Sequence, residues 1–188
     1  MAKIGLRNFR YGILTEAQDG TPSYGGPLTP GKAISCNVDI SSNNAMLYAD
    51  DTLAESDTSF QNGTATIGID DDDIETMATF LGHDVNQETG AMVRNVNDTA
   101  PYIGFGRIIV KQVNNAYKYK VEFLYKVKFS EPSQSDQTKG ETVEFATPEI
   151  EGIISALANG NWSITNSFDT YAEALSYLEG LLASPTSA

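Results

Sequence analysis

Histidine, cysteine and tryptophan each occur only once among the 188 residues of this chain, and these scarcities exclude several kinds of site. The single cysteine, Cys36, excludes an intrachain disulfide and a zinc site built from cysteine pairs. No apolar stretch approaches the roughly 18–20 residues that a membrane-spanning helix needs. The first residues also lack the apolar run of a secretory signal. We therefore expect a soluble product that is made and used inside a cell and binds no membrane.

Basic side chains are also few, with 12 Lys and Arg against 25 Asp and Glu, for a formal net charge of −13. Because phosphate contacts need clustered Lys and Arg, this balance argues against tight binding of nucleic acid. The charge is unevenly placed. Residues 39–98 contain 13 acidic side chains and one basic, whereas residues 99–129 contain six basic and one acidic. The chain thus separates acid from base along its length.

The remaining composition, 40% hydrophobic and 10% aromatic, is typical of a globular domain. Period-two alternation and β-branched runs predict several strands, whereas a Gly- and Pro-rich segment at 18–32 predicts a loop. Asn62-Gly63 suits a tight hairpin turn. The predicted strands are 4–14, 33–40, 45–49, 64–69, 102–113, 116–129, 141–146 and 162–164.

Two amphipathic segments predict helices. One follows the acidic run 70–73, with apolar residues spaced i, i+3, i+4, i+7 and Gly82 as a stop signal; the other spans 169–183. About eight strands and two helices favour a mainly β fold, an antiparallel β-sandwich or barrel with a flanking α-helix and a C-terminal α-helix. We expect one domain, 1–188, with extended loop excursions at about 41–63 and 130–140.

The strongest pattern is the strand at 116–129, where aromatic and β-branched residues alternate with lysines. Strict alternation predicts that all the odd-numbered residues from 119 to 129 face the core. The opposite face is either a solvated surface or a surface that docks the acidic 39–98 stretch of another copy. Its lysines are Lys118, Lys120, Lys126 and Lys128.

No set of residues predicts catalysis, a metal site or a cofactor. His83 follows a helix stop, where a surface-loop or helix-end position is a simpler interpretation than catalysis, and Cys36 lies on an alternating strand as a small core residue. Gly104 and Gly106 lie inside a predicted strand, which suits close backbone approach better than dinucleotide binding. The acidic run 70–73 lacks the spacing of a calcium loop and suits helix capping.

Ordered segments along nearly the whole chain, residues 4 to about 165, resemble one protein family. They are IGLRNFRYGIL, GKAISCNVDI, DDTLAESD, TATIGIDDDDIETMATFLG and VEFLYKVKFSEPSQSDQTKGETVEFATPEIEGII. These segments resemble the major tail proteins, or tail tube proteins, of long-tailed bacteriophages of the siphophage type. The segment 169–183 matches that pattern less distinctively.

The resemblance implies a structural virion protein and no enzyme. Such subunits form hexameric rings that stack into a hollow tail tube, around a tape-measure protein and between tail terminator and distal tail proteins. Viral DNA passes through the tube, without tight binding, during ejection into the host. The protein would be made in the bacterial host cytoplasm and reside in the virion tail. By analogy, the 41–63 excursion would reach a neighbouring subunit through its acidic residues, Asp50, Asp51, Glu55 and Asp57.

Two other classes of function remain open from the residues alone. A carbohydrate hydrolase on a β-sandwich would need two carboxylates at fixed separation, and nothing in the sequence selects two. A carbohydrate- or receptor-binding β-sandwich module of a virion would need exposed aromatic residues in a groove. The candidates for such a groove are Tyr24, Tyr48, Phe60 and Trp162.

Overall fold

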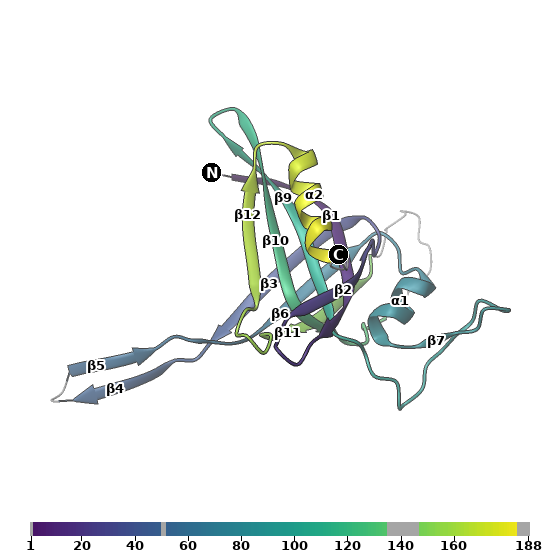
Figure 1. Ribbon diagram of the computed structural model, residues 1–188, viewed down its shortest axis with the longest axis horizontal. Coiled ribbons are helices and arrows are strands. Elements are labelled where there is room, and N and C mark those ends of the chain that lie inside the picture. The colour runs from purple at the N-terminus through teal and green to yellow at the C-terminus, as the bar shows by residue number, and fades with distance from the viewer. Residues whose placement is uncertain (1, 50–51, 135–146, 184–188) are drawn as a thin grey trace, which may run out of the picture.

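The computed structural model describes residues 2–49, 52–134 and 147–183, and its fold is mainly β. Eight strands form one antiparallel sheet in the order β2-β1-β9-β10-β11-β6-β3, with β12 also paired to β10 (Figure 1). The expected antiparallel β-sandwich with a flanking and a C-terminal helix is confirmed. The strands of this sheet are β1 (Ala2–Glu16), β2 (Pro22–Leu28), β3 (Ala33–Ser42), β6 (Phe60–Ile69), β9 (Ile103–Val113), β10 (Ala116–Phe129), β11 (Glu149–Ile154) and β12 (Ser163–Phe168).

Four further strands form two small hairpins outside this sheet. β4 (Ala45–Ala49) pairs with β5 (Thr52–Asp57) as an arm that extends far from the body in Figure 1. β7 (Asp84–Val85) pairs with β8 (Met92–Val93) in a loop on the opposite side of the molecule. The long excursion predicted at 41–63 is therefore largely an ordered hairpin, and we call β4 and β5 the arm.

Both predicted helices are present, and local capping defines their ends. α1 (Ile74–Leu81) begins at Asp73, whose carboxylate accepts a hydrogen bond from the backbone N–H of Thr76, and ends at Gly82 with a φ of 74°. α2 (Tyr171–Leu182) begins with a capping box between Thr170 and Glu173. The acidic run 70–73 thus supplies a helix cap, as predicted. Among the described residues, no helix is both long and apolar enough to span a membrane.

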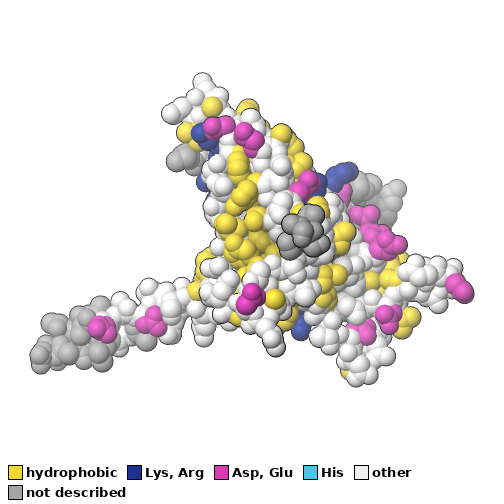
Figure 2. Space-filling view, in the orientation of Figure 1, with side chains coloured by type: hydrophobic (Ala, Val, Ile, Leu, Met, Phe, Trp, Pro, Cys, Tyr) yellow, Lys and Arg dark blue, Asp and Glu magenta, His cyan; other side chains and the backbone are white. Residues whose placement is uncertain are grey.

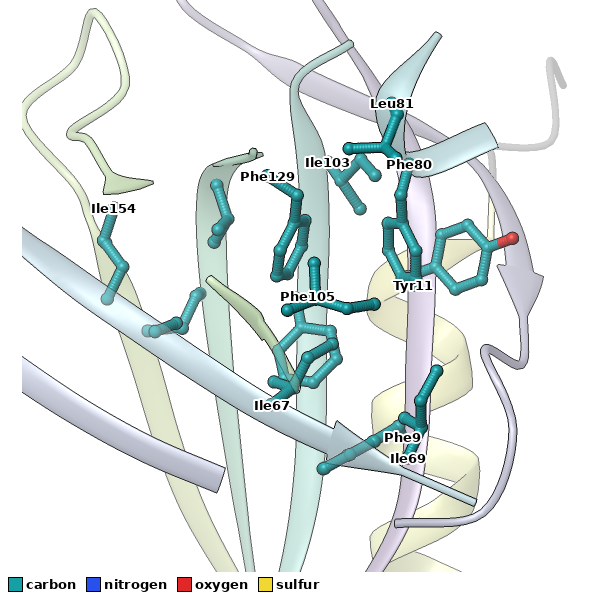
Figure 3. Packing of buried hydrophobic residues seen from close by; sticks show 14 of the residues in the cluster. Phe9, Tyr11, Ile67, Ile69, Phe80, Leu81, Ile103, Phe105, Phe129 and Ile154 are labelled. Atoms are coloured by element: carbon teal, nitrogen blue, oxygen red, sulfur yellow. The ribbon is translucent and has the colours of Figure 1, made fainter. Parts of the chain in front are cut away.

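The sheet buries side chains on both of its faces. One cluster, the α1-side core, joins β1, β6, β9, β11 and the end of β10 to α1 (Figure 3). It includes Phe9, Ile67, Phe80, Phe105 and Phe129, each 2% exposed or less. The other cluster, the α2-side core, packs Val121 and Phe123 of β10 against α2. Its helix residues, Ala174, Leu178 and Leu182, are fully buried.

Two local predictions are wrong. The segment predicted as a loop at 18–32 contains β2, which pairs with β1 and buries Tyr24 against Phe123. An edge strand tolerates its prolines, which a central strand would not. Asn62 and Gly63 lie inside β6, paired with β3, instead of forming a hairpin turn. The strand predicted at 141–146 and residues 135–140 of the second excursion lie outside the described residues.

Candidate assembly surfaces

The lysines of β10 do not share one face, because the strand contains a β-bulge. Leu124 pairs with Phe105 and Val127 pairs with Ile103, so two residues of β10 (125 and 126) oppose one residue of β9, Gly104. An extra residue reverses the alternation beyond it. The predicted single aromatic face is therefore wrong. Residues 119, 121, 123 and 125 belong to the α2-side core, whereas Leu124, Val127 and Phe129 belong to the α1-side core.

Beyond the bulge, Lys126 and Lys128 lie beside the ring of Tyr102. Their ammonium groups are 4.7 and 5.4 Å from the ring centroid, respectively, and Lys126 Nζ is also 2.7 Å from Glu16 Oε2. The hydrogen bond from Lys126, with another from the Ala158 backbone N–H, holds the pKa of Glu16 below its usual value. Within this chain, Lys126 therefore already has a carboxylate partner.

Before the bulge, Lys118 and Lys120 lie on the opposite face with Arg107. Lys118 Nζ is 2.5 Å from Asp169 Oδ1, and Lys120 Nζ is 3.6 Å from Glu122 Oε1. Arg107, 8% exposed, donates to Glu122 at 2.7 Å. Although burial alone would raise it, the pKa of Glu122 is lowered by its hydrogen bonds and charge interactions with Arg107 and Lys120.

Cys36 is half-buried beside this group and packs against the α1-side core. Its thiol accepts a hydrogen bond from Arg107, and burial raises its pKa in spite of that guanidinium group. A raised pKa keeps the thiol protonated and unreactive. This agrees with its prediction as a core residue.

Two further lysines, which sequence patterns did not single out, complete the face that Lys118 occupies. Lys3 of β1 pairs directly with Lys111 of β9, and Lys111 pairs directly with Lys118 of β10. Directly paired residues point to the same face of a sheet. We call Lys3, Lys111 and Lys118 the lysine row. The lysine row could not be predicted from sequence patterns, because the three residues are far apart in sequence and only strand register brings them together.

The arm carries the acidic residues expected at a subunit interface. Glu55 and Asp57 are exposed on β5, and acidic side chains are visible along the arm in Figure 2. Asp57 also accepts hydrogen bonds from the Ser59 backbone N–H at 2.9 Å and from Asn43 at 2.8 Å, which lower its pKa. Asp57 therefore also stabilises the base of the arm. Asp50 and Asp51 lie outside the described residues.

Three of the four aromatic residues considered for a binding groove lie in or against the hydrophobic cores. Tyr24 is 4% exposed in the α2-side core. Phe60 and Trp162 stack on each other with centroids 4.8 Å apart and an interplanar angle of 2°, packed against the α1-side core. This stack lies where β6 begins, directly after the arm. The side chain of Tyr48 is outside what the structure describes.

His83 lies directly after the end of α1, the helix-end position that was one of the two expected for it, and its side chain is only 6% exposed. Its Nδ1 is 2.6 Å from Asp98 Oδ2 and its Nε2 is 2.5 Å from Glu131 Oε1. The hydrogen bond to Asp98 is the largest cause that raises its pKa, and the contact with Glu131 adds to it. Both ring nitrogens are engaged, so this arrangement joins three segments and leaves neither nitrogen facing a nucleophile.

Gly104 and Gly106 allow the close packing that their positions in a strand predicted. A Cβ on Gly106 would lie 2.3 Å from Leu178 Cδ1 of α2, and one on Gly104 would lie 2.3 Å from the ring of Tyr24. A larger residue at either position would have to displace the buried side chain of Leu178 or Tyr24. These glycines therefore serve packing on the α2 side.

Within the described parts of the chain, no group of three or more His, Cys, Asp or Glu side chains could hold a metal ion. The geometry instead brings out two charged surfaces, the acidic arm and the lysine row, on separate parts of the molecule. The chain matches no known protein-family model and no curated protein.

Proposed function

We propose that this protein is a structural subunit of a bacteriophage tail, which assembles into hexameric rings that stack as a hollow tube for viral DNA. The observation that carries the proposal is the arm, an ordered hairpin that leaves the main sheet and extends away from the body (Figure 1). The likeness of the ordered segments to major tail proteins supports the same conclusion.

The arm favours assembly because of its exposure. A single two-stranded hairpin is at best marginally stable in water, and this one forms a two-stranded sheet of its own, apart from the main sheet. Its Met46 is 50% exposed. Contact with a neighbouring copy would cover both its backbone edges and the exposed part of Met46. We infer that the arm bridges subunits.

The charge of the chain supports the role of a DNA conduit. At a formal charge of −13, a wall made of these subunits repels phosphates over about a Debye length, roughly 8–10 Å at physiological salt. DNA would then pass without tight binding. The proposal places the protein in the virion tail, with a tape-measure protein inside the tube and terminator and distal tail proteins at its ends.

The test compares the full chain with an armless variant by sedimentation velocity and negative-stain microscopy over a concentration series. The backbone N–H of Asn43 donates to the carbonyl of Ser59 at 2.7 Å, so a two-residue Asn-Gly turn can replace residues 44–58 at this closing pair. We expect the full chain to form rings or tubes and the armless variant to stay monomeric.

Circular dichroism and thermal unfolding provide the control, because the main sheet does not include the arm and should keep its stability. A full chain that remains strictly monomeric at the highest attainable concentration would contradict the proposed function. Equal assembly of both chains would instead rule out the arm as the bridge between subunits.

A further inference from the structure

The lysine row places three like charges side by side across three strands. Lys3 and Lys118 flank Lys111 as direct cross-strand neighbours. Such pairs have Cβ atoms about 4.5–5.5 Å apart, and like charges in this position destabilise a sheet. Asp169 lies 2.5 Å from Lys118. Among the described residues, neither Lys3 nor Lys111 has a carboxylate partner. Within the described part of the chain, two of the three lysines of the row thus lack a carboxylate partner.

The arm is an acidic part of the chain that extends away from the body, and its charge complements this row. Residues 43–60 contain four acidic side chains and no basic one. Glu55 and Asp57 lie on the same face of β5, because they are two residues apart with no bulge between them. Their spacing, about 6.5–7 Å along a strand, suits the lysine row, whose neighbours are about 4.8 Å apart across strands and carry long flexible side chains.

We propose that the lysine row receives the acidic arm of a second copy of this chain, with Lys3 and Lys111 pairing with carboxylates that include Glu55. This inference rests on the proposed assembly and names the surface on which the arm docks. Lys126 and Lys128 take no part, because the bulge places them on the other face beside Tyr102.

A nucleic acid is the less favoured occupant of the row. Glu122 and Asp169 contact the lysines of this face, Lys120 and Lys118 respectively, and their carboxylates would repel phosphates. The net charge of the chain opposes DNA as well. The acidic arm instead needs only the two or three cations that the row supplies.

The experiment compares Lys111→Glu with the matched control Lys128→Glu. Both lysines are half-buried on neighbouring central strands, and both substitutions change the charge by the same amount, but on opposite faces. Sedimentation velocity gives the concentration at which half of the protein is assembled. We expect Lys111→Glu to raise this concentration at least tenfold, Lys128→Glu to change it less than twofold, and added salt to weaken the assembly of the wild type.

Two readouts separate docking from misfolding. Within the monomer, Lys111→Glu places opposite charges between Lys3 and Lys118, so its melting temperature should rise even as assembly weakens. Glu55→Lys alone should also weaken assembly, and Glu55→Lys combined with Lys111→Glu should restore it.

The outcomes are distinct from those of the proposed function. If the wild type assembles and Lys111→Glu behaves like Lys128→Glu, the docking surface is wrong and the tail function stands. If the wild type does not assemble at all, the proposed function fails first. If Lys111→Glu abolishes binding of a 30-base-pair DNA duplex but leaves assembly unchanged, the row binds phosphates and the proposal is overturned.

Discussion

The two faces of β10 both pack against a helix, but they do so in different ways. On the α2 side, Val121 and Phe123 pack against α2, a helix near the end of the described chain that begins with a capping box. On the α1 side, Val127 and Phe129 reach the opposite core only because a bulge reverses the strand. That core ends at a junction of His83 with Asp98 and Glu131. The single histidine of the chain thus lies on the α1 side of the sheet.

The largest expected effect tests whether Phe129 really belongs to the α1 side. Phe129 is 2% exposed, and its ring lies 4.8 Å from that of Phe80. Phe129→Ala should lower the free energy of unfolding by about 3–5 kcal/mol, because it leaves a cavity in the core. Urea denaturation measures the loss, and Phe129→Leu serves as a milder variant if the alanine variant does not fold.

Double-mutant cycles then separate the two faces. Phe129→Ala and Phe80→Ala should be coupled by about 0.5–1.5 kcal/mol, as expected for a contacting aromatic pair. Phe129→Ala and Leu178→Ala should be additive within about 0.5 kcal/mol, because Leu178 lies in the α2-side core. The reverse result would show that strict alternation continues to Phe129 and that the bulge is absent.

A smaller effect tests the α2 side through two of its glycines. Gly106→Ala should destabilise the protein by about 1–3 kcal/mol, since its Cβ would lie 2.3 Å from Leu178 Cδ1. Gly180 is the matched control: it lies inside α2 and a Cβ there meets no atom within 4 Å. Gly180→Ala should therefore stabilise the protein by about 0.5–1 kcal/mol. Two losses of similar size in urea denaturation would argue against close packing of α2.

The smallest effect concerns pH and should be confined to the α1 side. The pKa of His83 is raised from its ordinary value of 6.5, so its stabilising effect is fully present below about pH 6.5 and is lost as the pH rises through the raised value. The pKa of Asp98 is lowered from 3.8, mainly by its hydrogen bond with His83. The stabilising effect of Asp98 is therefore present above about pH 3.8 and is lost as the pH falls through its lowered pKa.

Urea denaturation from pH 5.5 to 8.5 should show that the free energy of unfolding of the wild type falls as the pH rises. The free energy of unfolding of His83→Gln should depend less on pH. Hydrogen exchange can locate this loss of stability, because amide protection should fall with rising pH around α1 and not around α2. A decline that is equally strong in His83→Gln would assign the pH dependence to another group.

Both helices and most strands of the main sheet could be predicted from sequence because their signals are local, whereas β2 and β11 could not. The apolar spacing after Asp73 and the glycine at position 82 define α1 within the chain itself. The single-sided strand at 116–129 could not be corrected in this way. Both faces of a buried strand accept Val and Phe, so the amino-acid sequence does not show that Phe123 and Phe129 face different cores.

Contacts between distant segments were also beyond the sequence patterns. Lys3 and Lys111 are neighbours only through the register of β1 on β9. The partners of His83 could not be predicted, because Asp98 and Glu131 are 15 and 48 residues away from it. The edge position of β2 was invisible for the same reason, since its prolines and glycines are locally typical of a loop.

The bulge in β10 also determines where this strand can change length. Residues 125 and 126 together oppose a single position of β9, so the loss of Lys126 would return β10 to regular alternation with Tyr125, Val127 and Phe129 still on their present faces. The loss of one residue anywhere between Tyr119 and Leu124 would move the side chains of part of the strand to the opposite face of the sheet. Length variation in β10 among related chains should therefore concentrate at this one point.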